Sequence, residues 1–192
     1  MILRVVKYGH PALRQKGKRI ESVTPEIKQL IADLFETMHA YKGIGLAAQQ
    51  VGVALQLTVI DVRGATDRPS TLELGGQPAD VADFMPLVLI NPELKFSGES
   101  VAGPEGCLSF PEIYADIVRP ETVDVTAMNG EGKQIEFRCG GLLSRAVQHE
   151  VDHLNGILYI DRMDKKTKEE LRPELEQLQA ETKAELLEAQ KA

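Results

Sequence analysis

Hydrophobic side chains recur every three or four residues early in the chain, and this spacing predicts an amphipathic helix over residues 24–42. Thr24 can cap its first turn, Pro25 suits the first helical position, and Gly43 ends it. The apolar face consists of Ile27, Leu30, Ile31, Leu34 and Met38.

Continuous apolar runs at residues 55–62 and 87–90 predict two mostly buried strands. Between them, residues 64–86 are rich in Gly, Pro and Asp and show no sustained period. We expect a long loop there, and such loops in a small domain are usually functional or mobile.

Farther along, residues 122–128 and 134–139 alternate apolar and polar positions on either side of Asn129-Gly130, which predicts an antiparallel hairpin. A second helix is expected over residues 142–154, followed by a short strand at 157–160.

From Asp164 the chain is dense in Glu, Lys, Gln and Ala, which predicts a terminal amphipathic helix over 164–192 that begins at Asp164 or only near Pro173. Its leucine stripe is too short for sustained heptads, so docking by one narrow face is favoured over a partner-binding coiled coil. These elements predict an α+β fold, with antiparallel β-sheets packed around the 142–154 helix and with an N-terminal and a C-terminal helix.

Composition favours one globular domain, residues 1–192, because 43% of the residues are hydrophobic and 27% are charged. The net charge is −7, with 22 basic residues scattered along the chain, so specific nucleic-acid binding is not expected. No apolar run reaches membrane-spanning length, and residues 1–10 do not read as a secretory signal. Two cysteines and no signal favour a reducing, cytoplasmic location without a disulfide.

The sharpest chemical pattern is HExxH at residues 149–153, inside the second predicted helix. Residues four apart share a helix face, so His149 and His153 can bind one metal ion while Glu150 lies beside it as a base. The alternative interpretation is two ordinary histidines on one helix face.

A catalytic site of this kind usually has three protein ligands. Metzincin proteases would supply a third histidine where this chain has Tyr159. A thermolysin-like site would use a later glutamate, and the nearest candidates, Glu169 and Glu170, lie in a stretch that looks fully solvated. Neither downstream position is therefore a good source of the third metal ligand.

An upstream candidate is Cys107, which follows Gly106 in the segment 105–109. A thiolate is a good ligand for zinc or ferrous iron, and the glycine allows a close backbone approach. A lone cysteine is more often a small buried hydrophobe, but beside an incomplete metal site the ligand interpretation prevails. Cys139 has no such neighbours and is expected to be structural.

Three segments together resemble the peptide deformylase family. Residues 43–49 resemble its GxGxAAxQ motif, residues 105–109 match EGCLS, and residues 148–156 match QHExDHLxG, all in the family's order. The resemblance extends from the first helix to about Asp161.

The resemblance implies a hydrolase that removes the formyl group from the formyl-methionine of newly made polypeptides and releases formate. It implies that Cys107, His149 and His153 bind one divalent ion, which is ferrous iron in the cell and is replaceable by zinc, nickel or cobalt. It also implies that Glu150 is the general acid/base. The side chain of Gln49 and the backbone N–H of Leu108 would stabilise the oxyanion, each worth about 3 kcal/mol.

The family also implies that the substrate backbone lies as an added strand against Ile44, Gly45 and Gly106. The walls of a methionine pocket are expected from Ile44, Leu142, Ala146 and Val147. Expected partners are formylmethionyl nascent peptides and, transiently, the ribosome, with the chain acting as a monomer or weak dimer.

Three polar residues near the site are open to interpretation. Asp152 and Gln148 could each bind the second ring nitrogen of a ligand histidine, and for Asp152 an ordinary salt bridge is an equal alternative. Arg145 is expected to face solvent rather than the peptide.

Two other functions compete with this prediction. One is a metallopeptidase of the HExxH type, which would cleave internal peptide bonds. The other is a non-catalytic metal-binding or ribosome-associated module. Glu150 and Gln49 argue against the second, because metal storage needs neither residue.

Overall fold

The structure is a computed structural model that describes all residues from Met1 to Ala192. Its helices, 3-10 helices (η) and strands are η1 (Pro11–Arg14), α1 (Pro25–Ala40), β1 (Gly45–Ala47), η2 (Ala48–Val51), β2 (Leu57–Ile60), β3 (Ser70–Leu74), β4 (Gln77–Pro78), α2 (Val81–Phe84), β5 (Leu87–Cys107), β6 (Phe110–Met128), β7 (Gln134–Gly140), α3 (Gly141–Leu154), η3 (Tyr159–Asp161) and α4 (Lys165–Lys191).

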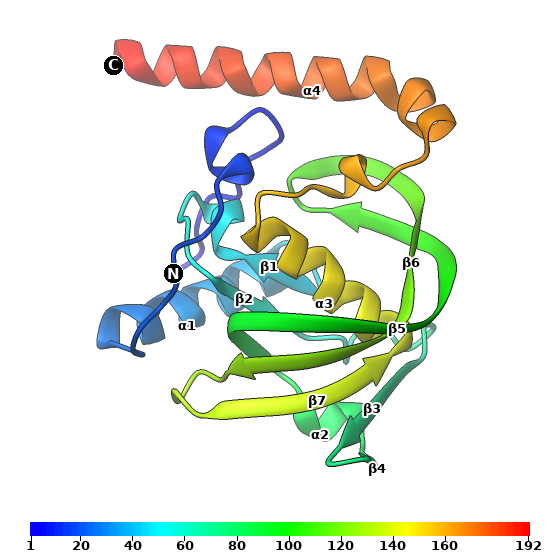
Figure 1. Cartoon of the computed structure of the whole chain (residues 1–192). Helices are drawn as coiled ribbons and strands as arrows, with labels where there is room; N and C mark the ends of the chain where they lie inside the picture. The colour runs from blue at the N-terminus through cyan, green and yellow to red at the C-terminus, as the bar shows by residue number, and fades with distance from the viewer.

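All strands join one antiparallel sheet of seven strands in the order β1-β2-β5-β6-β7-β3-β4. The long strands β5 and β6 pair with three register shifts, and such irregularities bend and twist a strand pair. The sheet therefore curves around α3, which lies at the centre of the molecule (Figure 1). The predicted α+β fold with antiparallel strands around the HExxH helix is confirmed.

Helix α3 is enclosed on nearly all sides, because twelve of its fourteen residues are buried. Its apolar residues, among them Leu143 and Val147, pack against the sheet in the largest hydrophobic cluster. Its polar residues are buried as well, so each needs a hydrogen-bond partner or a ligand inside the protein.

Helix α1 matches the prediction for 24–42 closely. The Thr24 side chain accepts a hydrogen bond from the Ile27 N–H at 3.2 Å, and Pro25 is the first helical residue. Leu34 and Met38 have no exposed surface, and they pack with β1 and β2 in a second cluster.

Helix α4 begins at Lys165, and Asp164 caps it by accepting a hydrogen bond from the Thr167 N–H at 2.7 Å. Pro173 lies inside the helix rather than at its start, and only Leu175 and Thr182 are buried. In Figure 1 the helix crosses the molecule beside the N-terminal segment, and its Leu175 packs in one cluster with Phe110 and Ile117 of β6.

Two predictions of local structure are wrong. Residues 64–86 are not a long loop, because they contain β3, β4 and α2, and Leu72 on β3 pairs with Cys139 on β7. Residues 157–160 do not form a strand but lead into η3, where Tyr159 and Ile160 are both buried against the third cluster. Short segments of this kind are stabilised by their neighbours rather than by their own periodicity.

The strand predicted at 87–90 is only the start of β5, which extends to Cys107. Asn91, where the prediction stopped, has a left-handed φ of 51° and lies at a register shift. Its side chain is bonded to both the N–H and the carbonyl of Ile20, so it fastens the N-terminal segment to the sheet. Strand β5 thus continues through a bulge and delivers Cys107 to the centre of the molecule.

Candidate metal centre and active-site cleft

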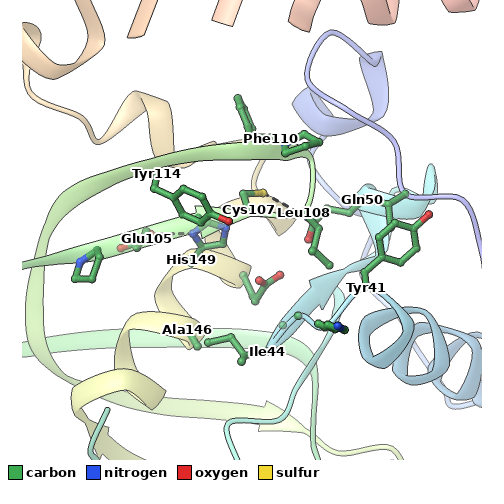
Figure 2. A pocket seen from close by; sticks show the side chains of 18 of the residues that line it. Tyr41, Ile44, Gln50, Glu105, Cys107, Leu108, Phe110, Tyr114, Ala146 and His149 are labelled. Carbon is green, nitrogen blue, oxygen red and sulfur yellow. Dashed lines mark hydrogen bonds and ion pairs between the residues drawn. The ribbon is translucent and has the colours of Figure 1, made fainter. Parts of the chain in front are cut away.

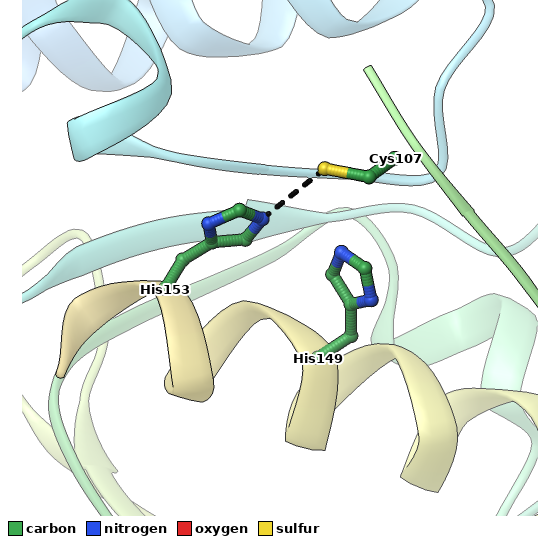
Figure 3. A group of neighbouring side chains, drawn as sticks. All are labelled: Cys107, His149 and His153. Carbon is green, nitrogen blue, oxygen red and sulfur yellow. Dashed lines mark hydrogen bonds between the residues drawn. The ribbon is translucent and has the colours of Figure 1, made fainter. Parts of the chain in front are cut away.

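The end of β5 and the buried face of α3 bring together a thiol and two imidazoles. The Cys107 Sγ lies 3.4 Å from the His153 Nε2, and potential ligand atoms of Cys107, His149 and His153 all lie within 4.8 Å of one another (Figure 3). Figure 3 shows both rings projecting from α3 toward the sulfur. His149 is 8% exposed and His153 is 1% exposed, so both imidazoles are shielded from bulk water, whereas Cys107 is partly exposed.

This donor set suits a metal ion. One thiolate and two neutral imidazoles are ligands that zinc and ferrous iron accept, and three protein ligands leave room for a reacting molecule. Neither downstream alternative supplies a third ligand. Tyr159 donates its hydroxyl to the Ile113 carbonyl at 2.7 Å, and Glu169 and Glu170 are exposed on α4.

Glu105 orients the first histidine of the motif. Its Oε1 lies 2.8 Å from the His149 Nδ1, which leaves the other ring nitrogen for a metal. Arg119 donates two hydrogen bonds to the same carboxylate, at 2.6 and 2.9 Å, and Arg145 donates a third at 2.9 Å. Burial raises the pKa of Glu105, but the hydrogen bonds from His149 and Arg119 outweigh it and lower the pKa to about 2.

The partner of His149 is neither of the two residues suggested from the sequence, and for Asp152 the alternative interpretation, a salt bridge, is confirmed. Gln148 donates to the Pro120 carbonyl and the Ser144 hydroxyl, both at 2.9 Å, so it supports the helix and not a ring. Asp152 accepts from Arg119 at 2.9 Å and from Arg162 at 2.9 and 3.1 Å, which makes it an ion-pair residue. The only sequence signal for Glu105 was its place two residues before Cys107.

Glu150 is 5% exposed and lies deep in the site, with one oxygen 3.5 Å from the Thr58 hydroxyl. Burial raises its pKa to about 7, although the His149 charge and the Thr58 hydroxyl oppose the rise. A Cβ at Gly45 would lie 2.6 Å from the Glu150 Oε1, so any residue other than glycine would displace this carboxyl group. A carboxyl group with a pKa near neutrality can both accept and return a proton.

The assignment of Gln49 to the site is wrong by one residue. The Gln49 Nε2 donates to the carbonyls of Leu154 and Gln15, at 3.3 and 3.4 Å, and its side chain does not line the cleft. Gln50 does line it, with its Nε2 3.5 Å from the Cys107 Sγ and 3.2 Å from the Ser109 Oγ (Figure 2).

GxGxAAxQ has eight positions, so a pattern that starts at Gly43 ends at Gln50. Both glutamines lie on η2, where about three residues make one turn, so neighbouring side chains point in directions about 120° apart. A shift of one residue therefore changes which side chain faces the metal centre.

Cys107 and His149 line a cleft of about 840 Å³. Among the residues predicted to contact substrate, those that line the cleft are Ile44, Gly45, Gly106, Leu108, Leu142 and Ala146. Val147 does not line it but is fully buried in the core. Tyr41, Phe110 and Tyr114, which the sequence did not single out, also line the cleft (Figure 2).

Arg145 does not face solvent as predicted. Its side chain is 12% exposed, and besides Glu105 it donates to the Ile117 carbonyl at 2.7 Å and the Val101 carbonyl at 2.9 Å. A Cβ at Gly103 would lie 2.9 Å from the guanidinium carbon. Arg145 therefore fastens the β5–β6 arch to α3 at the edge of the cleft.

A carboxyl group beside three convergent ligand atoms, at the head of a cleft large enough for a peptide, is the arrangement of a metal-dependent hydrolase. Comparison with known proteins narrows this class. The family model described as polypeptide deformylase matches residues 2–169, and the chain belongs to this family.

Relatives of similar length support the assignment. Peptide deformylases of Methylacidiphilum infernorum and Opitutus terrae are 48% and 44% identical to the chain, over 93% and 88% of it and the same shares of their own length. Among solved structures, a variant of Arabidopsis thaliana peptide deformylase 1B has a TM-score of 0.82 at 36% identity and covers 96% of this chain and 94% of its own. A Synechococcus elongatus peptide deformylase, solved in complex with actinonin, has a TM-score of 0.74 at 36% identity, with 94% and 85% covered.

The activity follows from this membership. The chain is a metal-dependent hydrolase that removes the N-formyl group from the formyl-methionine of newly made polypeptides. None of its helices combines the length and the apolar character that a membrane span requires.

Proposed function

We propose that Cys107, His149 and His153 hold the metal ion and that Glu150 moves the proton in deformylation. The observation that carries this proposal is the convergence of three ligand atoms within 4.8 Å of one another, beside a buried carboxyl group. When bound, the ion supplies Lewis acidity, which lowers the pKa of water and polarises the formyl carbonyl. Ferrous iron is the proposed ion in the cell, with zinc, nickel or cobalt as replacements.

Glu150 accepts a proton as water attacks the formyl carbon and returns it to the leaving amine, which gives formate and a free N-terminus. Its buried position and raised pKa suit both transfers, because neither protonation state is strongly disfavoured near pH 7. The Gln50 side chain and the Leu108 backbone N–H stabilise the oxyanion that forms between these two steps. Both residues line the cleft on the side of Cys107.

The substrate backbone is proposed to pair with β1, which is the outer strand at one end of the sheet. Ile44, Leu142 and Ala146 provide apolar wall for the methionine side chain. We further propose that the chain acts as one catalytic domain in the cytoplasm, as a monomer or weak dimer, in transient association with the ribosome.

Release of formate from a formyl-Met peptide tests the roles of the site residues. Glu150→Gln should lower kcat by about 10²–10⁴-fold with unchanged metal content, because an amide cannot accept the proton. Undiminished turnover by this variant would refute the proposed role of Glu150.

The two neighbouring glutamines provide a matched pair. Gln50→Leu should lower kcat by about 100-fold, the effect of one oxyanion donor. Gln49→Leu should instead lower stability, because the Gln15 carbonyl loses its side-chain donor and the Leu154 carbonyl loses one of its three donors, and it should leave the kcat of folded protein nearly unchanged. If Gln49→Leu lowers kcat and Gln50→Leu does not, Gln49 and not Gln50 stabilises the oxyanion.

A further inference from the structure

The lining of the cleft has the opposite charge from the molecule as a whole. Five basic and three acidic residues line it, a net charge of +2, whereas the whole chain has −7. The basic residues are Arg4, Lys7, Lys42, Arg68 and Arg145, and the acidic ones are Glu105, Glu112 and Glu150.

Several of these charges are already paired inside the protein. Arg145 and Glu105 bind each other at 2.9 Å, and Arg4 pairs with Glu185 on α4 at 2.8 Å. Glu150 is buried at the head of the cleft.

The charges that remain at the rim are mainly positive. Lys7, Lys42 and Arg68 line the cleft and take part in none of the protein's ion pairs. Glu112 is the only unpaired exposed carboxylate among the lining residues. Asp67 lies close to Arg68 along the chain, and Asp116 lies close to it across the sheet. Neither carboxylate forms an ion pair with Arg68.

The three rim cations border different sides of the cleft. Lys42 directly precedes the turn into β1, and the Arg68 guanidinium donates to the Pro104 carbonyl on β5 at 3.2 Å. Lys7 lies beside the β5–β6 turn, because the next residue donates its N–H to the Ser109 carbonyl at 2.9 Å.

An extended peptide advances about 3.3 Å per residue. With its formyl end at the metal centre, the three residues that follow methionine would extend about 10 Å along the cleft that Lys42 and Arg68 also line.

We propose that Lys42 and Arg68 form a subsite for acidic side chains, so that the enzyme favours Asp or Glu over Lys or Arg at the three positions after formyl-methionine. This inference rests on the proposed binding of the formyl end beside Cys107 and His149. Exposed ion pairs are individually weak and are screened by salt, so the discrimination is modest and falls with ionic strength. Because such contacts form equally in the ground state and the transition state, they lower KM and leave kcat unchanged.

Amidated peptides of the form formyl-Met-Ala-Xaa-Ala test the subsite without a competing terminal carboxylate. At low salt the order of kcat/KM should be Glu, then Gln, then Lys at the variable position, with about 3–10-fold between the extremes, carried by KM. At 0.5 M NaCl the ratio should approach one. Equal rates for the three peptides at low salt would overturn the subsite, whereas no formate from any of them would overturn the proposed function instead.

Charge-reversal variants distinguish a local effect of Lys42 and Arg68 from an effect of the protein's total charge. The double variant Lys42→Glu with Arg68→Glu should invert the order of the Glu and Lys peptides. Lys28→Glu, at an exposed position of α1 outside the cleft, serves as the control and should keep the wild-type order. If the double variant keeps the wild-type order, or if the control changes it as much, the subsite does not exist.

Discussion

Two arginine–carboxylate pairs lie in different regions of the molecule, and strand β6 contributes one residue to each. In both pairs the arginine donates two hydrogen bonds to one carboxylate. Beneath the metal centre, Arg119 binds Glu105 on β5 through two nitrogens at 2.6 and 2.9 Å, with both side chains 4% exposed. On the solvent face of the sheet, Arg138 on β7 binds Asp124 through two nitrogens at 2.7 and 3.0 Å, with side chains 51% and 39% exposed.

The difference between the two regions lies in what surrounds each pair. The buried pair continues into Asp152 and His149 on α3, so it joins the arch of β5 and β6 to the helix that carries the site. The exposed pair competes with water and holds two strands that already share a ladder of hydrogen bonds. The same pairing of arginine and carboxylate therefore positions His149, a proposed metal ligand, in one region and contributes little to stability in the other.

The largest expected effect comes from removing the arginine of each pair in turn. Arg119→Met leaves Glu105 and Asp152 buried with fewer cations, so the free energy of unfolding should fall by about 3–5 kcal/mol. Arg138→Met should cost less than about 1 kcal/mol. Urea unfolding at fixed metal loading measures both, and equal losses would show that burial does not make the Arg119 pair more important than the Arg138 pair.

A smaller effect is expected when the carboxylate loses its charge but keeps its shape. Glu105→Gln deprives His149 of its anionic partner, and loss of such a partner typically weakens metal binding by about 10–100-fold. Asp124→Asn is the matched control and should leave metal affinity unchanged. Competition with a chromogenic chelator measures both constants, and retention of wild-type affinity by Glu105→Gln would remove this carboxylate from the site.

Arg145 lies between the two extremes, since it is partly exposed and shares Glu105 with Arg119. Arg145→Met should lower the free energy of unfolding by about 1–2 kcal/mol, because two carbonyls lose a charged donor while Glu105 remains paired. Arg145→Lys should recover only part of this loss, because lysine lacks the planar fork. Full recovery in thermal unfolding would show that charge alone matters.

The smallest expected effect is a difference in chemical reactivity between the thiols of the two cysteines. Burial raises the pKa of the Cys139 thiol to about 12, so at pH 8 it remains protonated and should not react with iodoacetamide in folded protein. Removal of the metal by a chelator should expose one reactive thiol, that of Cys107, and unfolding should expose the second. Mass spectrometry of the digested protein locates the label, and rapid labelling of Cys139 before unfolding would contradict its assignment to the core.

Local patterns predicted most of the architecture. The spacing of apolar residues and the cap at Thr24 located α1, and the alternation around Asn129-Gly130 located β7 and the last seven residues of β6. The short strands β3 and β4 were missed because β3 pairs with the distant strand β7, and β4 pairs only with β3 across a turn at Gly75-Gly76. A strand that depends on a neighbour leaves little signal in its own sequence.

Within the site, the sequence by itself determined that His149, Glu150 and His153 lie together, because helical periodicity is a local property of five consecutive residues. It did not determine the surroundings of Arg145 or the partner of His149. The contacts in question are made by residues far away in the sequence. Glu105 lies 44 residues before His149, which it contacts, and Cys107 lies 46 residues before His153. Only the curvature of β5 and β6 around α3 brings these groups together, and burial then requires each charge to find a partner.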